Sequence, residues 1–384
     1  MHIKKFAMTI RIDNIQPNML KWAIQRAGHN VETYLDKNDK VRSWIEGEKF
    51  PTMRQLEDFA NSMYVPCGYL FLDTPPAESM PIPLFRGSSS SANMNLNVYE
   101  TVLTMQYRQE WLEEFIQNEL DGEELPFVSS MSVKDGVDNV VARIRELLNL
   151  EENWVFTERD SASAANKLSQ QMEAIGVVTS FNGVVGNNTH RKISVEECRG
   201  FALVSRIAPF VFVNNDDAKS AQLFTLIHEF THLLLGISAG FGGIDDSHDD
   251  ASERFCDQVA ADFLVPKMLF VAQWKMSDGS IEKCAKKFKV SSLVIARRAY
   301  AMNMLSAHDY QEFYNRYKAI WKNPKKTSES GRGNFYLSAA KRVGKLFGAY
   351  VNTAVNSGYL LHRDAYRLTG LHGTSFDKVI TNQI

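Results

Sequence analysis

Three residues in one apolar segment have side chains that could carry out chemistry. The segment LFTLIHEFTHLLLG, residues 223–236, holds His228, Glu229 and His232 among leucines and aromatic residues. On an α-helix, positions four apart lie on one face, so the two imidazoles can bind a single metal ion. Glu229 would then lie beside that ion, towards a bound water. Two histidine ligands with a neighbouring carboxylate are typical of zinc hydrolases.

A catalytic zinc needs a third protein ligand, and two downstream segments offer one. The segment ERFCD places Glu253 and Asp257 four residues apart, on one face of a second predicted helix. One carboxylate could bind the metal while the other accepts the free N–H of a ligand histidine. The alternative is His248 with the aspartates around it, in the predicted loop GISAGFGGIDDSHDD. Precise sites are rare in mobile loops, so we favour Glu253 and expect a solvated turn at His248.

The predicted reaction at these residues is hydrolysis. In such sites zinc lowers the pKa of its bound water, and Glu229 would accept the proton as hydroxide attacks a carbonyl group. Glu229 could then return the proton to the leaving amine. The other interpretation is two buried histidines hydrogen-bonded in a core, or a metal site that has lost its chemistry. The sequence does not identify a residue that would stabilise an oxyanion.

The elements around these residues predict an α+β fold that is mostly α. Short β-branched and aromatic runs at 175–186 and 199–215, bounded by glycine, asparagine and proline, predict two or three strands before the histidine helix. Helical periodicity covers most of the remaining chain. Its main segments are 96–120, 137–148, 162–175, 251–265, 279–305 and an amphipathic helix over 336–355. The sheet and the histidine helix would therefore come from one region of the chain.

The N-terminal part predicts a compact helical unit, from residue 17 to about 75. Four short segments with helical spacing suggest a helix-turn-helix, whose second helix would be 40–46. That helix would place Lys40, Arg42 and Ser43 in the major groove of DNA. Two glutamates follow directly and reduce the positive potential that a phosphate backbone requires. The alternative is a unit that binds protein or caps the fold.

Composition limits the class of protein further. Hydrophobic residues make up 44% and charged residues 23% of the 384, which are values of globular proteins. The formal net charge of −2 means that nucleic-acid contact would require a local basic patch. Four scattered cysteines without a CxxC pair suit a reducing compartment. With no apolar signal segment and no run of about 18 apolar residues, we expect a cytoplasmic protein without a membrane partner.

The order of motifs along the chain resembles that of a known family. The motifs are WAIQRAG, WIEGEKFPTMRQLEDFA, PIPLFR, RGFAL, FTLIHEFTHLLLG and ERFCDQVAADFLVP. Over nearly the whole chain this series is similar to the ImmA/IrrE family of metallo-endopeptidases with an N-terminal Xre-type helix-turn-helix domain. The resemblance implies a zincin-like core, with Zn²⁺ held by His228, His232 and Glu253 and with Glu229 as catalytic acid and base. It also implies cleavage of an Xre-type repressor, which would derepress mobile-element, stress or DNA-damage-response genes.

The domain boundaries follow from these motifs and from two polar stretches. We predict an Xre-like helix-turn-helix domain at 1–75, a linker at 76–95, a zincin-like metallopeptidase domain at 96–270, a helix-turn-helix-like helical domain at 271–322, a second linker at 323–334 and a C-terminal helical segment at 335–384. The fourth part is the most basic, with Ser291 as a predicted helix N-cap. Its lysines and arginines could form a solvated face or a surface for a substrate. The C-terminal segment would pack on the fold or bind a partner.

The same architecture implies a second class of function. Proteins of this kind often lie beside a PIN-type ribonuclease toxin and look like antitoxins. The chain would then neutralise a cognate toxin and repress its own operon through DNA, with the metal site structural or vestigial. A third possibility is a DNA-binding regulator without proteolysis. The intact histidine motif together with Glu253 favours a peptidase acting on a protein substrate.

Overall fold

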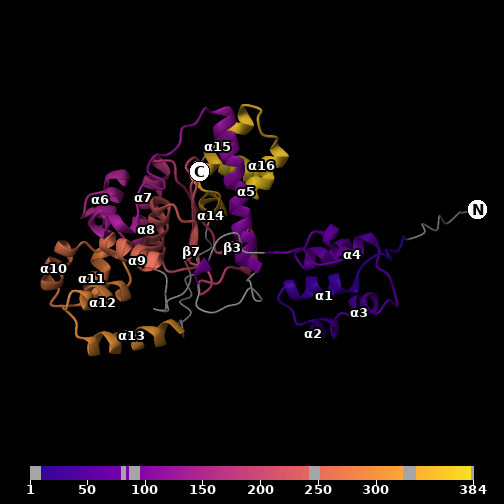
Figure 1. Ribbon diagram of the computed structural model, residues 1–384, viewed down its shortest axis with the longest axis horizontal. Helices are drawn as coiled ribbons and strands as arrows, with labels where there is room; N and C mark the ends of the chain where they lie inside the picture. The colour runs from indigo at the N-terminus through magenta and orange to yellow at the C-terminus, as the bar shows by residue number, and fades with distance from the viewer. Residues whose placement is uncertain (1–9, 79–83, 86–95, 242–250, 323–333, 382–384) are drawn as a thin grey trace, which may run out of the picture. The chain divides into compact units, whose positions relative to one another are not determined.

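The computed structural model describes residues 10–78, 84–85, 96–241, 251–322 and 334–381. The chain divides into two compact units, Met1–Met80 and Pro81–Ile384. Helices dominate both, with one small sheet and one hairpin in the second unit, so the α+β, mostly α prediction is confirmed (Figure 1). His248 and residues 323–333 of the predicted second linker lie outside the described residues. In the parts of the chain that are described, no helix combines the length and the apolar character needed to cross a bilayer.

The N-terminal unit is built from short helices around a small core. Its elements are α1 (Pro17–Arg26), α2 (Val31–Leu35), α3 (Asp39–Ile45), α4 (Met53–Ser62) and the 3-10 helix η1 (Cys67–Phe71). Side chains that cap the first turn fix where α2 and α4 begin: Asn30 accepts the N–H of Thr33, and Thr52 forms a capping box with Gln55. Aliphatic side chains from α1, α3, α4 and η1, together with Phe59, form the buried centre.

The main sheet of the second unit has the strand order β1-β7-β5-β6-β2. Its strands are β1 (Leu84–Phe85), β2 (Val178–Phe181), β5 (Gly200–Leu203), β6 (Phe210–Val213) and β7 (Ala239–Phe241). Strand β5 pairs antiparallel with both β6 and β7, whereas β1–β7 and β2–β6 are parallel pairs. A separate hairpin joins β3 (Val184–Val185) to β4 (Asn188–Lys192).

The prediction of two or three strands before the histidine helix was therefore too low, since six strands of the described residues, β1 to β6, precede residue 219. Strands β1 and β7 fall where the sequence predicted a linker and a loop. They contain two and three residues, too few to show the alternation by which a strand is recognised in sequence. Their pairing partners come from distant parts of the chain, so only the folded sheet defines them.

Helices cover both faces of this sheet. The relevant elements are α5 (Leu96–Glu119), η3 (Val133–Asp135), α6 (Val137–Leu148), η4 (Trp154–Thr157), α7 (Ser161–Ala174), α8 (Lys219–Leu235) and α9 (Ala251–Leu264). Helix α8 packs between α7 and α9 and lies against β5, β6 and β7. Figure 1 shows α5 on the other side of the sheet from α8. Side chains of a strand point alternately to the two faces of the sheet. Ala202 of β5 and Val211 of β6 belong to the same hydrophobic core as the leucines of α8.

A second helical layer packs beside α9. It contains α10 (Lys267–Met276), α11 (Ile281–Phe288), α12 (Ser292–Ala301) and α13 (Ala307–Lys322). Ser291 caps α12 as expected, since its hydroxyl oxygen accepts the N–H of Val294 at 3.3 Å. Part of the predicted basic surface is used within the fold, because Arg298 pairs with Asp262 of α9. Helix α12 is thus tied to the helix that carries Glu253.

The C-terminal segment contains two helices where the sequence predicted one over 336–355. Its elements are α14 (Phe335–Val343), α15 (Lys345–Asn356), α16 (His362–Thr369), α17 (Thr374–Phe376) and the π-helix η5 (Asp377–Thr381). The break falls at Gly344, which has φ 88° and lies so close to β2 that a Cβ would be 2.6 Å from the carbonyl oxygen of Thr179. Amphipathic periodicity continues across this point, so it did not indicate the turn.

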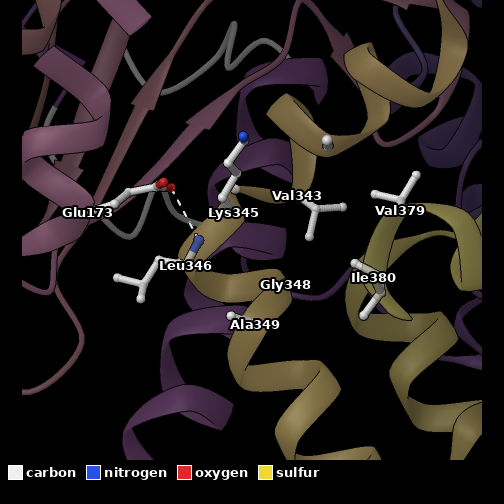
Figure 2. Close-up of a pocket in the computed structure, with 10 residues that line it drawn as sticks. Glu173, Val343, Lys345, Leu346, Gly348, Ala349, Val379 and Ile380 are labelled. Carbon is white, nitrogen blue, oxygen red and sulfur yellow. Dashed lines mark hydrogen bonds between the residues drawn. The ribbon is translucent and has the colours of Figure 1, made fainter. Parts of the chain in front are cut away.

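Contacts with the sheet side make this segment part of the second unit. Arg108 of α5 is buried, and its guanidinium donates to the carbonyl oxygens of Leu368 and Arg342. These carbonyls lie at the C-terminal ends of α16 and α14, where helices leave acceptors unpaired. Figure 2 shows a pocket lined by residues of α7, α14, α15 and η5, with a volume of about 300 Å³. Glu173, from α7, accepts the N–H of Leu346 at 3.4 Å.

Candidate metal centre

Helix α8 brings the two histidines and Glu229 into the interior of the second unit. All three side chains have no exposed surface, and most of the leucines and phenylalanines of the same helix are equally buried. A helix that is apolar on nearly every side must be enclosed by other elements, as α8 is by the sheet, α7 and α9. Burying three ionisable groups in such a helix is costly unless they share a charge or an ion.

Helix α9 supplies the third donor. Glu253 is fully buried, and its Oε1 and Oε2 lie 3.0 Å from His232 Nε2 and 3.2 Å from His228 Nε2, respectively. The two Nε2 atoms are themselves 3.2 Å apart. Donor atoms of these three residues therefore converge within 4.8 Å of one another. The structure brings together the three residues that the sequence proposed as ligands.

The donor geometry fits a small tetrahedral ion. Ligands of zinc, at about 2.0–2.1 Å from the metal in a tetrahedral arrangement, lie about 3.3 Å apart, close to the separations found here. Nδ1 of His228 is 3.0 Å from Oδ1 of Asp257, so its proton is best assigned to Nδ1. The Nε2 lone pair of His228 then points towards the other two donors. Lone pairs at this distance repel unless a cation or proton lies between them.

The electrostatics of the centre favour positive charge. Burial lowers the pKa of His228, but hydrogen bonds to Asp257 and Glu253 outweigh it and raise the pKa to about 10. Burial raises the pKa of Glu253, but hydrogen bonds from His228 and His232 lower it to about 2. Both shifts have the same origin, namely carboxylates and imidazoles forced together away from water. A divalent cation would satisfy the same demand for positive charge.

Glu229 differs from Glu253 in having no protein partner. Neither of its carboxylate oxygens accepts a hydrogen bond from any described residue, although both are buried. Burial raises its pKa well above the usual value, while the charge of His228 acts in the opposite direction. A buried carboxylate without a partner is rare unless it serves a ligand, a water or a reaction. The position next to the donors suits action on a group bound there.

The first residue of β5 lies against this carboxylate. A Cβ built on Gly200 would be 3.2 Å from Oε1 of Glu229 and 2.5 Å from Cγ2 of Thr225. Any larger residue at position 200 would therefore crowd the Glu229 carboxylate and Thr225 between α8 and β5. The sequence indicated Gly200 only as the boundary of a strand, and its contact with Glu229 did not follow from that. Its position directly before a buried strand was the one signal that could have suggested close packing.

Cys256 is a second neighbour that the sequence analysis did not single out. Its buried Sγ lies 3.8 Å from Nδ1 of His232, on the side of the ring away from Glu253. Nδ1 of His228 thus faces the carboxylate of Asp257, and Nδ1 of His232 faces the thiol of Cys256. The spacing could have suggested this, because Cys256 follows Glu253 by three residues and shares its helix face.

Comparison with protein families addresses this region of the chain directly. Residues 173–300 match the IrrE N-terminal-like domain. This metallopeptidase family domain covers α8 and α9 and includes all three candidate ligands. Residues 343–382 match a domain of unknown function, DUF8813, which spans the C-terminal helices from α15 onwards. No curated protein matches the chain. The IrrE N-terminal-like domain thus coincides with the buried donor cluster.

The predicted DNA-contacting residues lie in the other unit, on α3. Lys40 is exposed, whereas Arg42 is half-buried and pairs with Asp36 at 2.6 Å. Ser43 is buried, and its hydroxyl donates to the carbonyl oxygen of Lys40 at 2.8 Å. Of the three residues, Lys40 is therefore the one that is exposed to solvent.

Proposed function

We propose that this chain is a zinc-dependent endopeptidase that cleaves an Xre-type transcriptional repressor and so derepresses mobile-element, stress or DNA-damage-response genes. The observation that carries the proposal is Glu229. Its buried, unpartnered carboxylate stands beside three converging donors from α8 and α9. A structural metal site has no use for such a group, whereas a hydrolase needs a general base there.

Different residues of the chain would bind the metal, orient its ligands and transfer the proton. His228, His232 and Glu253 would hold the ion, and Asp257 would orient the ring of His228 through the hydrogen bond at Nδ1. Zinc bound by two imidazoles and a carboxylate supplies Lewis-acid chemistry and an acidified water. Glu229 would take up a proton at its carboxylate and release it to the leaving amine.

The class of substrate rests on the resemblance and on the N-terminal unit. A peptidase joined to a DNA-contacting domain could act on a repressor at its operator. We propose that α3 makes this contact through Lys40 and Arg42. Lys40→Ala should weaken binding to DNA from upstream of the gene and lower its salt dependence by about one counterion, whereas Lys21→Ala on α1 should not. Equal effects of the two substitutions would argue against a role for α3.

Glu229→Gln tests the peptidase directly. The substitution preserves size but removes the base, so we expect the protein to keep one zinc per chain and to cleave about 10²–10⁴-fold more slowly. The assay follows fragments of a neighbouring Xre-type repressor by mass spectrometry, with derepression of its target gene as the cellular readout. Glu173→Gln is the control, because it makes the same change at a half-buried carboxylate of the same unit, away from the donors.

The alternative function gives the opposite result. An antitoxin with a vestigial metal site neutralises its toxin without a general base. If Glu229→Gln keeps full biological activity, the peptidase proposal is wrong. Growth of cells that carry a cognate ribonuclease toxin then becomes the informative measurement.

A further inference from the structure

A buried arginine stands directly before the glycine that contacts Glu229. Arg199 precedes β5, and only 9% of its side chain is exposed. Its Nη1 donates to Oδ2 of Asp217 at 2.9 Å. Asp217 is held in turn, because its Oδ1 accepts the N–H of Ala218 at 2.8 Å. The guanidinium is therefore fixed at the end of the sheet from which α8 begins.

Two of the three nitrogen atoms of this guanidinium have no hydrogen-bond acceptor among the described residues. Nε and Nη2 are buried, and neither has a hydrogen-bond partner there. An unpaired buried donor costs free energy, and a charged one costs more. A guanidinium presents its donors as a planar fork that matches two acceptor oxygens. Asp217 accepts a hydrogen bond from Nη1, and Nε and Nη2 have no acceptor among the described residues.

The charge of Arg199 also acts on Tyr317, a polar residue of the α12–α13 layer. Burial raises the pKa of Tyr317 on α13, while the charge of Arg199 and a hydrogen bond with Ser291 lower it. The charges of Asp217 and Arg297 also act on the Tyr317 hydroxyl. The guanidinium thus links the start of β5 to the residue pair before α8, and its charge acts on α13.

We propose that Arg199 is a substrate-recognition residue that binds an acceptor oxygen of the protein being cleaved. This inference rests on the proposed peptidase function. Arg199 precedes Gly200, which contacts Glu229, but the guanidinium of Arg199 is bound to Asp217, two residues before α8, whereas Glu229 lies ten residues into that helix. At a rise of 1.5 Å per residue the guanidinium lies on the order of 10–15 Å from Glu229, so the bound oxygen would belong to a substrate residue several positions away from the cleaved bond. It could come from an acidic side chain or from a main-chain carbonyl group, since both offer an acceptor to the free N–H groups.

Asp217 acts as a positioning residue for this guanidinium. Asp217 balances the charge of Arg199 when no substrate is present, which lowers the cost of burying it. The arrangement leaves the arginine oriented in advance, so little side-chain entropy is lost on binding. A structural arginine would instead have all of its donors satisfied by protein, as Arg108 nearly does on the other face of the sheet.

The first test observes the donor itself. The full-length zinc-loaded chain is labelled with ¹⁵N-arginine, and the Nε–H signal of Arg199 is assigned by its loss in Arg199→Lys. The chain is then titrated with N-acetyl-aspartate N-methylamide and with the asparagine counterpart. A shift with the aspartate probe alone assigns an acidic side chain, and a shift with both assigns a carbonyl group. If neither probe moves the signal, a bound water satisfies the donors and the inference is overturned.

The second test uses cleavage of a proteome-derived peptide library by the same protein. Arg199→Lys and Arg199→Met should raise KM about tenfold or more with little change in kcat, with lysine less affected. Arg206→Met is the control, since Arg206 follows the same strand but is exposed and pairs with Glu124. Unchanged KM and unchanged sequence preference in Arg199→Met would contradict the inference. Absence of any cleavage by the wild type would count against the peptidase, while the titration still decides the role of Arg199.

Discussion

Nδ1 of His228 lies 3.0 Å from Oδ1 of Asp257, so a carboxylate on α9 holds a candidate ligand on α8. The same helix α9 carries Glu253, one turn earlier. One helix therefore supplies both a donor to the ion and the acceptor that sets the tautomer of another donor. Such an arrangement links the metal affinity of the site to the packing of α8 against α9.

Replacing Asp257 should weaken metal binding without removing a ligand. In Asp257→Ala the ring of His228 loses its acceptor, and we expect zinc affinity to fall about 10–100-fold. Competition with a chromogenic chelator measures the dissociation constant. Asp262→Ala is the control on the same helix, since Asp262 pairs with Arg298 and not with the donors. Equal losses in the two variants would show that α9 packing, and not the hydrogen bond, is responsible.

Removing the metal should destabilise the second unit. Zinc at a thousandfold excess over its dissociation constant stabilises a folded protein by about 4 kcal/mol. We expect the melting temperature to fall on treatment with a chelator and to recover with added zinc. In His232→Ala and Glu253→Ala the zinc-dependent part of this shift should disappear, because each loses one of three donors. Full zinc stoichiometry in Glu253→Ala would identify a different third ligand.

A methyl group on Gly200 should disturb both stability and catalysis. Its Cβ would lie 2.5 Å from Thr225 Cγ2 and 2.7 Å from the carbonyl oxygen of Phe212, so the strand or helix must shift. We expect a loss of about 1–3 kcal/mol in the free energy of unfolding, and lower kcat because Glu229 moves with α8. Gly348→Ala should be nearly neutral, because its Cβ would meet the flexible end of Ile380 at 3.3 Å and Cγ1 of Val343 at an ordinary 3.9 Å. Similar effects of both substitutions would contradict this account.

Glu173 should make stability depend on pH in a defined direction. Burial raises its pKa, although hydrogen bonds from Leu346 and Thr179 partly oppose this. The folded chain then holds a proton that the unfolded chain releases near pH 4.5, so stability is greatest below that pH. It should fall as the pH rises through the raised value.

The measurement compares wild type with Glu173→Gln in urea unfolding between pH 4 and 8. The amide cannot ionise, so the variant should lose less stability as the pH increases, and the difference between the two proteins isolates this group. A constant difference across the range would show that Glu173 titrates alike in folded and unfolded chains.

Local spacing in the sequence was enough to find most of the candidate site. His228, Glu229 and His232 share a helix whose periodicity is evident, and Glu253 and Asp257 are related by the same four-residue step. The α+β character followed from the change of period before the histidine helix. These features depend on residues close in the chain, where the geometry of a helix or strand is known in advance.

Relations between distant residues could be decided only by the tertiary structure. Gly200 reaches Glu229 across 29 positions because β5 packs on α8, and no local pattern encodes that contact. The same holds for the unpaired donors of Arg199 and for the short strands β1 and β7. The break at Gly344 likewise depends on β2 lying against it. Packing between elements creates close approaches and unsatisfied groups, and these depend on three-dimensional neighbours that a linear sequence does not specify.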